Sequence, residues 1–306
     1  MPLYGNILQT VGKTPLVRLN KVCENIDATI LAKLESRNPM GSVKDRIAVS
    51  MIEAKESTGE LKPGMTVIAA TSGNTGIGLA MVCAAKGYKL VITMPETVSI
   101  ERIRILRRMG AVVILTPGAE LMSGAVKKAE EIHRGIVGSV LIDQFQDPAN
   151  VEVHERTTAR EIIEDTGGKL DIFVAGAGTG GTITGVGKAL KSLKQNIRIV
   201  AVEPDESPVL SGGKPGKHLI QGIGPGFVPP ILDRTVIDEV IRVKSEDAIK
   251  MALRIAREEG IFCGISSGAA CVAAVEVGKR RENAGKTIVT IFPDTGERYL
   301  SMEMEK

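Results

Sequence analysis

The sequence predicts an α/β protein with mostly parallel, twisted sheets flanked by helices, and two observations carry that prediction. From about residue 65 onward, short β-branched runs alternate with helical patterns, as they do in repeated strand–helix–strand units. The predicted strands are apolar throughout instead of alternating apolar and polar residues, which is typical of parallel sheets covered on both faces. A length of 306 residues allows one large domain or two medium ones.

The predicted elements follow one another to the end of the chain, each strand a short run rich in Val, Ile, Leu, Ala or Thr. Strands are expected at residues 66–70, 89–94, 111–116, 139–142, 170–175, 197–203, 236–243 and 286–292. Helices are expected at residues 75–86, 121–134 and 181–193, between an N-cap at Ser99 and a stop at Gly110, and from near residues 150, 245 and 267. Residues 204–230 are rich in Gly and Pro without periodicity, and a loop of that length usually forms the rim of a site.

Composition excludes several classes of function. A net charge of +3 is small for this length, and aromatic residues make up only 3% with no Trp, so neither a nucleic acid nor an anionic membrane is an expected partner. No apolar run is long enough to cross a bilayer, and residues 1–10 lack the regions of a signal peptide. The protein is therefore expected to be cytoplasmic.

Cysteine and histidine usage argues against a metal site. The four cysteines form no C-x-x-C pair and no zinc spacing, and the three histidines are scattered. Small buried apolar side chains in a reducing compartment are the simplest interpretation of Cys23, Cys83, Cys263 and Cys271.

The segment of residues 38–46 (NPMGSVKDR) places a lysine where a helix disfavours one. Pro39 and Gly41 break the preceding segment, and Ser42 is a suitable N-cap for the helix that follows. Lys44 then falls in the first turn, where the helix dipole is positive and, with partial burial, favours the neutral amine that forms Schiff bases. A lysine that simply extends into solvent is the alternative.

The loop of residues 71–76 (TSGNTG) lies between a predicted strand and a predicted helix. It offers hydroxyl groups, an amide and the N–H groups of a helix N-terminus, which together can bind a carboxylate or a phosphate. A tight strand-to-helix turn without a ligand is the alternative.

The loop of residues 176–182 (GAGTGGT) also joins a strand to a helix, and its backbone can approach an anion closely. Gly176, Gly178 and Gly181 match the G-x-G-x-x-G pattern, and Glu203 ends the next predicted strand. A nicotinamide or flavin protein is therefore the rival hypothesis. That hypothesis leaves Lys44 and the loop of residues 71–76 without roles.

A third glycine-rich segment, residues 264–269 (GISSGA), opens a helix and by itself is only a good N-cap. In open α/β sheets the turns at the carboxyl ends of the strands gather in one crevice. Together these features indicate a site for pyridoxal 5'-phosphate (PLP). They are a Schiff-base lysine, a carboxylate cradle, a cradle for a single phosphate and a hydroxyl group at a helix start.

Six motifs stand in the order seen in cysteine synthases: residues 12–17 (GKTPLV), 38–46, 71–76, 178–182, 221–224 (QGIG) and 264–268. The chain thus resembles the O-acetylserine sulfhydrylases, fold-type II PLP enzymes of the tryptophan synthase β-like group, over essentially its full length. One departure is Ala69-Ala70, where the family commonly has Glu-Pro, and it bears on the stiffness of the next loop more than on chemistry.

The resemblance implies a role for each matching residue. Lys44 resembles the catalytic lysine that carries the cofactor, Asn74 the partner of the cofactor's phenolic oxygen, and Ser266 the hydroxyl group that faces the pyridine nitrogen. The phosphate loop corresponds to Gly178, Thr179, Gly180, Gly181 and Thr182. The substrate contacts correspond to Thr71, Ser72, Thr75, Gln144 and Gly222.

The resemblance also implies an organisation and a reaction. Residues 37–146 would form a smaller mobile substrate-binding domain, and residues 1–36 and 147–306 a larger cofactor-binding domain. The reaction would convert O-acetyl-L-serine and sulfide to L-cysteine and acetate through an internal aldimine, an external aldimine and an α-aminoacrylate. A homodimer is expected, and the C-terminal tail of serine acetyltransferase is an expected competitor of the substrate. The alternatives are chemistry like that of cystathionine β-synthase, an O-phosphoserine-using sulfhydrylase, or a homologue that only binds a partner.

Overall fold

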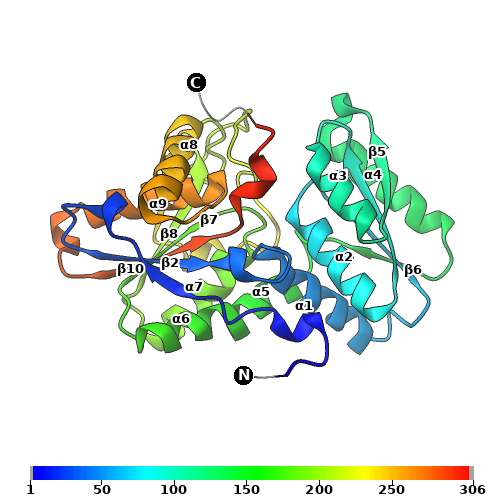
Figure 1. The fold of residues 1–306 in the computed structure, drawn as a ribbon, viewed down its shortest axis with the longest axis horizontal. Helices are drawn as coiled ribbons and strands as arrows, with labels where there is room; N and C mark the ends of the chain where they lie inside the picture. The colour runs from blue at the N-terminus through cyan, green and yellow to red at the C-terminus, as the bar shows by residue number, and fades with distance from the viewer. Residues whose placement is uncertain (1–2, 303–306) are drawn as a thin grey trace. The chain divides into compact units, whose positions relative to one another are not determined.

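The computed structural model describes residues 3–302, which form two compact units. Unit 1 contains residues 38–150 together with residues 3–11, and unit 2 contains residues 12–37 and 151–302. Each unit is built around its own sheet, as Figure 1 shows. The chain therefore starts in unit 1, contributes two strands to unit 2, returns to complete unit 1 and ends in unit 2.

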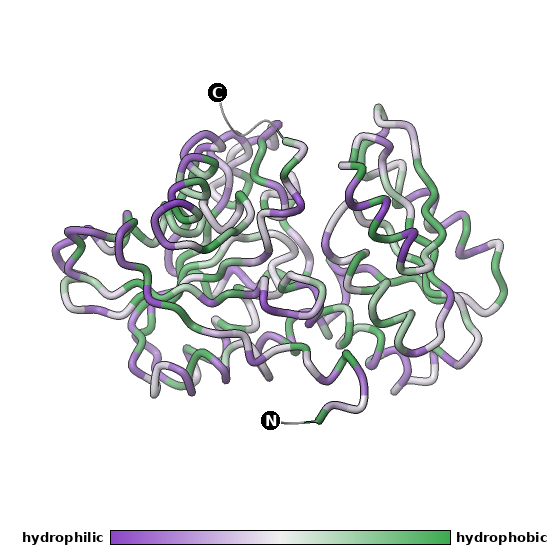
Figure 2. The backbone as a smooth tube through the Cα atoms, viewed as in Figure 1, coloured by the Kyte–Doolittle hydropathy of each residue, from purple (hydrophilic) through white to green (hydrophobic). Residues whose placement is uncertain are grey.

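Unit 1 is built on a four-stranded parallel sheet of order β5-β4-β3-β6. Its strands are β3 (Thr66–Ala70), β4 (Lys89–Pro95), β5 (Val112–Thr116) and β6 (Ser139–Ile142). Its helices are α1 (Lys44–Ser57), α2 (Asn74–Lys86), α3 (Ile100–Arg108) and α4 (Leu121–Gly135), and α5 (Ala149–Val153) begins where unit 1 ends. The edge strand β5 is hydrophobic along its length (Figure 2).

Unit 2 is built on a six-stranded sheet of order β1-β2-β10-β7-β8-β9. Its strands are β1 (Leu16–Arg18), β2 (Thr29–Leu34), β7 (Ile172–Gly176), β8 (Arg198–Pro204), β9 (Glu239–Val243) and β10 (Thr287–Phe292). All neighbours are parallel except β1 and β2. Its helices are α6 (Ala159–Thr166), α7 (Gly181–Leu193), α8 (Ser245–Arg254) and α9 (Ile265–Gly278).

Helices cover both faces of the unit 2 sheet. Successive residues of a strand point to opposite faces, so neighbouring residues show which helix covers each face. Val174 belongs to a core cluster that includes Ala269 of α9, whereas its neighbour Phe173 belongs to a second cluster that includes Ile183 of α7. Strands that are buried on both faces need no polar alternation, which explains why they read as continuous apolar runs. The predicted fold class is confirmed.

The strands of unit 2 differ from the sequence-based expectation mainly in two ways. The strand predicted from residue 236 begins only at Glu239, because Asp233 caps a 3-10 turn by accepting a hydrogen bond from the Thr235 N–H at 3.0 Å. The strands β1 and β2 were not predicted at all. The loops of residues 71–76 and 176–182 follow β3 and β7, which are strands of two different sheets.

The cysteines are buried and their thiols are free. Burial raises the thiol pKa of Cys23, Cys83 and Cys263 to about 12, and that of Cys271 well above its usual range. Because the thiolate is the reactive form, these side chains act as small apolar core residues. Within residues 3–302, no helix combines the length and the hydropathy that crossing a membrane requires.

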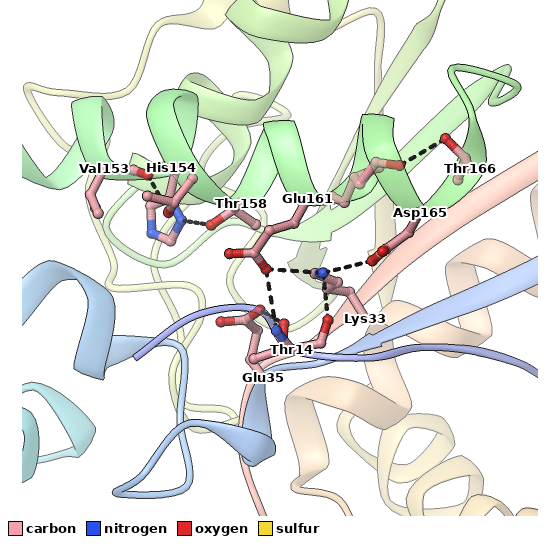
Figure 3. Close-up of polar contacts among 11 residues, drawn as sticks. Thr14, Lys33, Glu35, Val153, His154, Thr158, Glu161, Asp165 and Thr166 are labelled. Atoms are coloured by element: carbon pink, nitrogen blue, oxygen red, sulfur yellow. Dashed lines mark hydrogen bonds and ion pairs between the residues drawn. The ribbon is translucent and has the colours of Figure 1, made fainter. Parts of the chain in front are cut away.

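A buried ionic cluster fixes the segment of residues 12–17 to the sheet of unit 2 (Figure 3). The fully buried Lys33 of β2 binds Glu161 at 3.0 Å and Asp165 at 3.1 Å, both on α6, and donates to the Thr14 carbonyl oxygen at 2.6 Å. Thr14 also donates through its hydroxyl group to Glu35 Oε1 at 2.6 Å. The motif of residues 12–17 thus helps to hold β2 against α6.

We expect Lys33→Met to lower the free energy of unfolding by about 3 kcal/mol, because it removes the buried cation that pairs with the largely buried Glu161 carboxylate. The value is at the low end of the usual range since the Asp165 side chain keeps 43% of its surface exposed. Urea unfolding measures the effect. The matched control is Lys188→Met, which removes an exposed ion pair with Asp233 and should cost at most about 1 kcal/mol. Equal losses in the two variants would contradict this account of the cluster.

Candidate active site

Lys44 is the first residue of α1, so its side chain starts at the helix N-terminus, as the sequence indicated. The N-cap is Val43 instead of the predicted Ser42, although the Lys44 N–H still donates to Ser42 Oγ at 3.3 Å. Helix α1 packs on α2 here, since a Cβ on Gly78 would lie 3.0 Å from the Lys44 carbonyl oxygen. The half-buried lysine therefore lies beside the first turns of α2.

The loop between β3 and α2, together with the first two residues of α2, carries four of the predicted site residues. Thr71 extends the sheet, its N–H donating to the Thr93 carbonyl oxygen at 3.1 Å, and its Oγ1 accepts from the Gly73 N–H at 3.3 Å. Ser72 follows Thr71, and Asn74 is the first residue of α2 after the N-cap Gly73. The first N–H groups of a helix have no partner within the helix, so the start of α2 can bind an anion beside this loop.

Gln144 joins this loop from the segment that follows β6. The Thr75 hydroxyl group donates to Gln144 Oε1 at 2.5 Å, which leaves the Nε2 amide of Gln144 as a donor for a ligand. The fully buried Asn150 holds the Gln144 backbone by donating to its carbonyl oxygen at 2.7 Å. Unit 1 thus brings together Lys44, Asn74 and the predicted carboxylate contacts, all around the N-terminus of α2.

The predicted phosphate loop lies in unit 2, between β7 and α7. Gly180 adopts a positive φ of 88° as the N-cap of α7, and a Cβ there would also lie 2.7 Å from Leu232 Cβ. Thr179 Oγ1 accepts from the Gly181 N–H at 3.3 Å. The backbone of residues 178–182 therefore presents the first N–H groups of a 13-residue helix without bulky side chains in front of them.

The Gln221–Gly224 segment packs against both the phosphate loop and the start of α9. A Cβ on Gly178 would lie 2.3 Å from the Gly222 carbonyl oxygen, and a Cβ on Gly222 would lie 4.0 Å from Ser266 Oγ. Unit 2 thus brings Gly178, Gly222 and Ser266 together. The fully buried Ser267 has no such proximity to Gly222 among the described residues, which favours Ser266 as the hydroxyl group at this site.

The acidic residue of the dinucleotide fingerprint is engaged by its own chain. The buried carboxylate of Glu203 accepts from the N–H groups of Leu210 at 2.7 Å and Ser211 at 3.0 Å, and from the Ser211 hydroxyl group at 2.5 Å. In a dinucleotide site that carboxylate binds the ribose hydroxyl groups. Here it holds the long loop after β8, so the structure argues against the nicotinamide or flavin hypothesis.

Sequence reasoning missed the residues that support these loops. His154 is buried in a π-helical turn, and its ring contacts Thr158 Oγ1 at 2.9 Å (Figure 3) and Thr182 Oγ1 at 3.2 Å. Asn150 holds the backbone of Gln144 in the same indirect way. Neither residue belongs to a motif, and only their burial in the fold reveals them.

The chain matches the family model described as pyridoxal-phosphate dependent enzyme over residues 7–294. It is 54% identical over 297 residues to the cysteine synthase of Staphylococcus aureus (strain Mu50 / ATCC 700699), an alignment that covers 97% of this chain and 95% of that protein.

Two solved structures extend the comparison. The cysteine synthase of Entamoeba histolytica superposes with a TM-score of 0.96 at 47% identity, covering 99% of this chain and 91% of that one. An O-ureido-L-serine synthase superposes with a TM-score of 0.95 at 43% identity, covering 99% of this chain and 95% of that one.

Proposed function

Because the chain belongs to the family of pyridoxal-phosphate dependent enzymes, we propose that it catalyses a β-replacement that forms L-cysteine and acetate from O-acetyl-L-serine and sulfide. The observation that carries the proposal is the position of Lys44, whose helix packs on α2 beside a helix N-terminus lined with hydroxyl and amide donors. An amine beside a carboxylate cradle is what an amino-acid substrate requires.

The residues present fit PLP. Lys44 supplies the amine that would hold its aldehyde, Asn74 would bind its phenolic oxygen, and Ser266 would face its pyridine nitrogen. The glycine-lined N-terminus of α7 would bind the phosphate, since any side chain at Gly178 or Gly180 would collide with a neighbouring segment. When bound, PLP supplies the electron sink that makes loss of the substrate's Cα proton possible.

Substrate orientation would come from unit 1. Thr71, Ser72, Thr75 and the Gln144 amide would bind the α-carboxylate at the N-terminus of α2, where the helix dipole favours an anion. The resemblance to cysteine synthases supports Gly222 as a further substrate contact. Fixing the carboxylate and the amino group leaves the Cα–H bond one orientation, which lowers the entropic cost of proton removal.

Proton transfer would be the task of Lys44. Its Nζ would take the proton from the substrate's Cα as acetate leaves Cβ, and would return it to Cα after sulfide has added to Cβ. Ser266 would contribute through its lack of a negative charge. A neutral hydroxyl group does not hold the pyridine nitrogen protonated as a carboxylate would, so the electron sink is weaker and elimination of acetate is favoured over transamination or racemisation.

We further propose that residues 37–146 form a mobile substrate-binding domain and that residues 1–36 and 147–306 form the cofactor-binding domain, bounds that differ from those of the two compact units at residues 3–11, 37 and 147–150. We also propose that the enzyme is a homodimer. The resemblance to cysteine synthases supports these assignments. Sedimentation at micromolar concentration tests the dimer, and a monomeric mass would contradict it.

The activity is tested by incubating the PLP-loaded protein with sulfide and one of three donors, O-acetyl-L-serine, O-phospho-L-serine or L-serine, and measuring cysteine and the released group. We expect O-acetyl-L-serine to give the highest kcat/KM. Preference for O-phospho-L-serine, or cystathionine formation from L-serine when homocysteine replaces sulfide, would identify one of the alternative reactions instead.

A peptide that ends in isoleucine should compete with O-acetyl-L-serine, because a chain terminus offers the same carboxylate to the loop of residues 71–75. Thr75→Ala should weaken both ligands together by about tenfold, since it removes the hydroxyl group that binds Gln144 Oε1 and so holds the Gln144 amide in place for the carboxylate. Isothermal titration of the peptide measures this. The absence of heat at high peptide concentration, with O-acetyl-L-serine still binding, would exclude the acetyltransferase tail as a partner.

A further inference from the structure

Helix α3 buries one of its arginines beside the carboxylate cradle. Arg102 is 6% exposed, whereas Arg104, Arg107 and Arg108 of the same helix are exposed. Burial of a guanidinium group is unfavourable unless its N–H groups find acceptors, so a buried arginine on an otherwise solvated cationic helix calls for a specific partner.

One such partner is the backbone of the cradle. Arg102 Nη1 donates to the Ser72 carbonyl oxygen at 3.1 Å, across 30 positions of sequence, and α3 packs on α2 in this unit (Figure 1). A hydrogen bond from an ionised donor is shorter and stronger than a neutral one. The contact therefore anchors the loop at the residue before the N-cap of α2.

The peptide bond between Ser72 and Gly73 is held at both ends. Arg102 binds its carbonyl oxygen, and Thr71 Oγ1 accepts from its N–H at 3.3 Å. Because a peptide group is planar, fixing the carbonyl oxygen also fixes the direction of the Gly73 N–H and of the hydroxyl group that binds it. Arg102 thus determines the orientation of donors that it does not itself provide, and it adds a positive charge one peptide group away from them.

We propose that Arg102 is a positioning residue for the substrate's α-carboxylate, which acts by fixing the Ser72–Gly73 peptide. The proposal rests on the assignment of the loop of residues 71–75 as the carboxylate cradle. If Arg102 acts in this way, its loss should weaken the binding only of ligands that carry a carboxylate. Loss of a purely structural residue should weaken the binding of all ligands.

The test uses the PLP-loaded enzyme and two ligands that differ in the carboxylate, L-serine and 2-aminoethanol, with each Kd measured from the change in cofactor absorption. Arg102→Gln should raise the Kd of L-serine about tenfold, the effect of one charge-assisted hydrogen bond. It should leave the Kd of 2-aminoethanol and of PLP within twofold of the parent values. The matched control is Arg104→Gln, which removes the same charge from the exposed side of α3 and should change neither Kd.

Unchanged L-serine binding in Arg102→Gln would overturn the proposal, and so would equal weakening of both ligands, which would indicate a structural role. If Arg102→Gln does not fold, Arg102→Lys takes its place, and weakening confined to L-serine supports the proposal while its absence overturns it. A parent enzyme that binds the two ligands equally well would instead show that the loop is not a carboxylate cradle. That result is distinct from a failure of Arg102 alone.

Discussion

Lys44→Ala is expected to abolish cysteine formation and the covalent attachment of the cofactor. The lost proton transfer alone should lower the rate by about 10²- to 10⁴-fold, and the lost amine adds to that. The fold should survive. Lys44 is the first residue of α1, where the positive end of the helix dipole disfavours a cation, so its removal should leave the free energy of unfolding unchanged or raise it by up to about 1 kcal/mol.

The measurement combines borohydride reduction of the PLP-loaded protein, mass spectrometry of its peptides, and the rate of cysteine formation. In the parent protein the pyridoxyl group should be found on Lys44. Lys55→Ala is the control on the same helix, because Lys55 only makes an exposed ion pair with Glu60. A Lys44→Ala variant with near-normal cysteine synthesis would refute the assignment of this lysine.

Gly178→Ala is expected to have the second largest effect, because its Cβ would lie 2.3 Å from the carbonyl oxygen of Gly222. That neighbour is backbone and cannot rotate away, so the phosphate loop and the Gln221–Gly224 segment must move apart. The displacement should weaken PLP binding at least about tenfold and lower the free energy of unfolding by about 1–3 kcal/mol. It should also alter the surroundings of Ser266, which lies on the other side of Gly222.

Titration of the apoprotein with PLP and urea unfolding measure the two effects. The control is Gly135→Ala, because a Cβ on Gly135 meets no atom within 4 Å and this glycine ends α4 without a positive φ. Parent-like PLP affinity in Gly178→Ala would mean that the loop of residues 178–182 does not bind the phosphate.

Local signals allowed much of this fold to be predicted from the sequence. The helix predicted at residues 181–193 is α7 with the same bounds, and Gly180 can adopt the positive φ observed at its N-cap because glycine has no Cβ. The position of Lys44 could also be predicted from local residues, because Pro39 and Gly41 separate α1 from the preceding segment.

The features that escaped prediction depend on contacts between residues far apart in sequence. Strand β2 contains a charged residue, Lys33, at a fully buried position, and its burial depends on Glu161 and Asp165 of α6 and on the Thr14 carbonyl oxygen. The division of the glycine-rich loops between two sheets is likewise set by strand pairing. Arg102 carries no motif, and its burial and its contact with Ser72 appear only in the folded chain.

The central claim is that Lys44 and the two loops form a PLP site for O-acetyl-L-serine, and one spectrum tests it most directly. The purified, PLP-loaded protein is titrated with O-acetyl-L-serine in the absence of sulfide while its visible absorption is recorded. The claim predicts a yellow protein whose band shifts to a new, stable maximum as acetate is released, and sulfide should restore the original band. A spectrum that O-acetyl-L-serine leaves unchanged, or a protein that does not retain PLP, would contradict it.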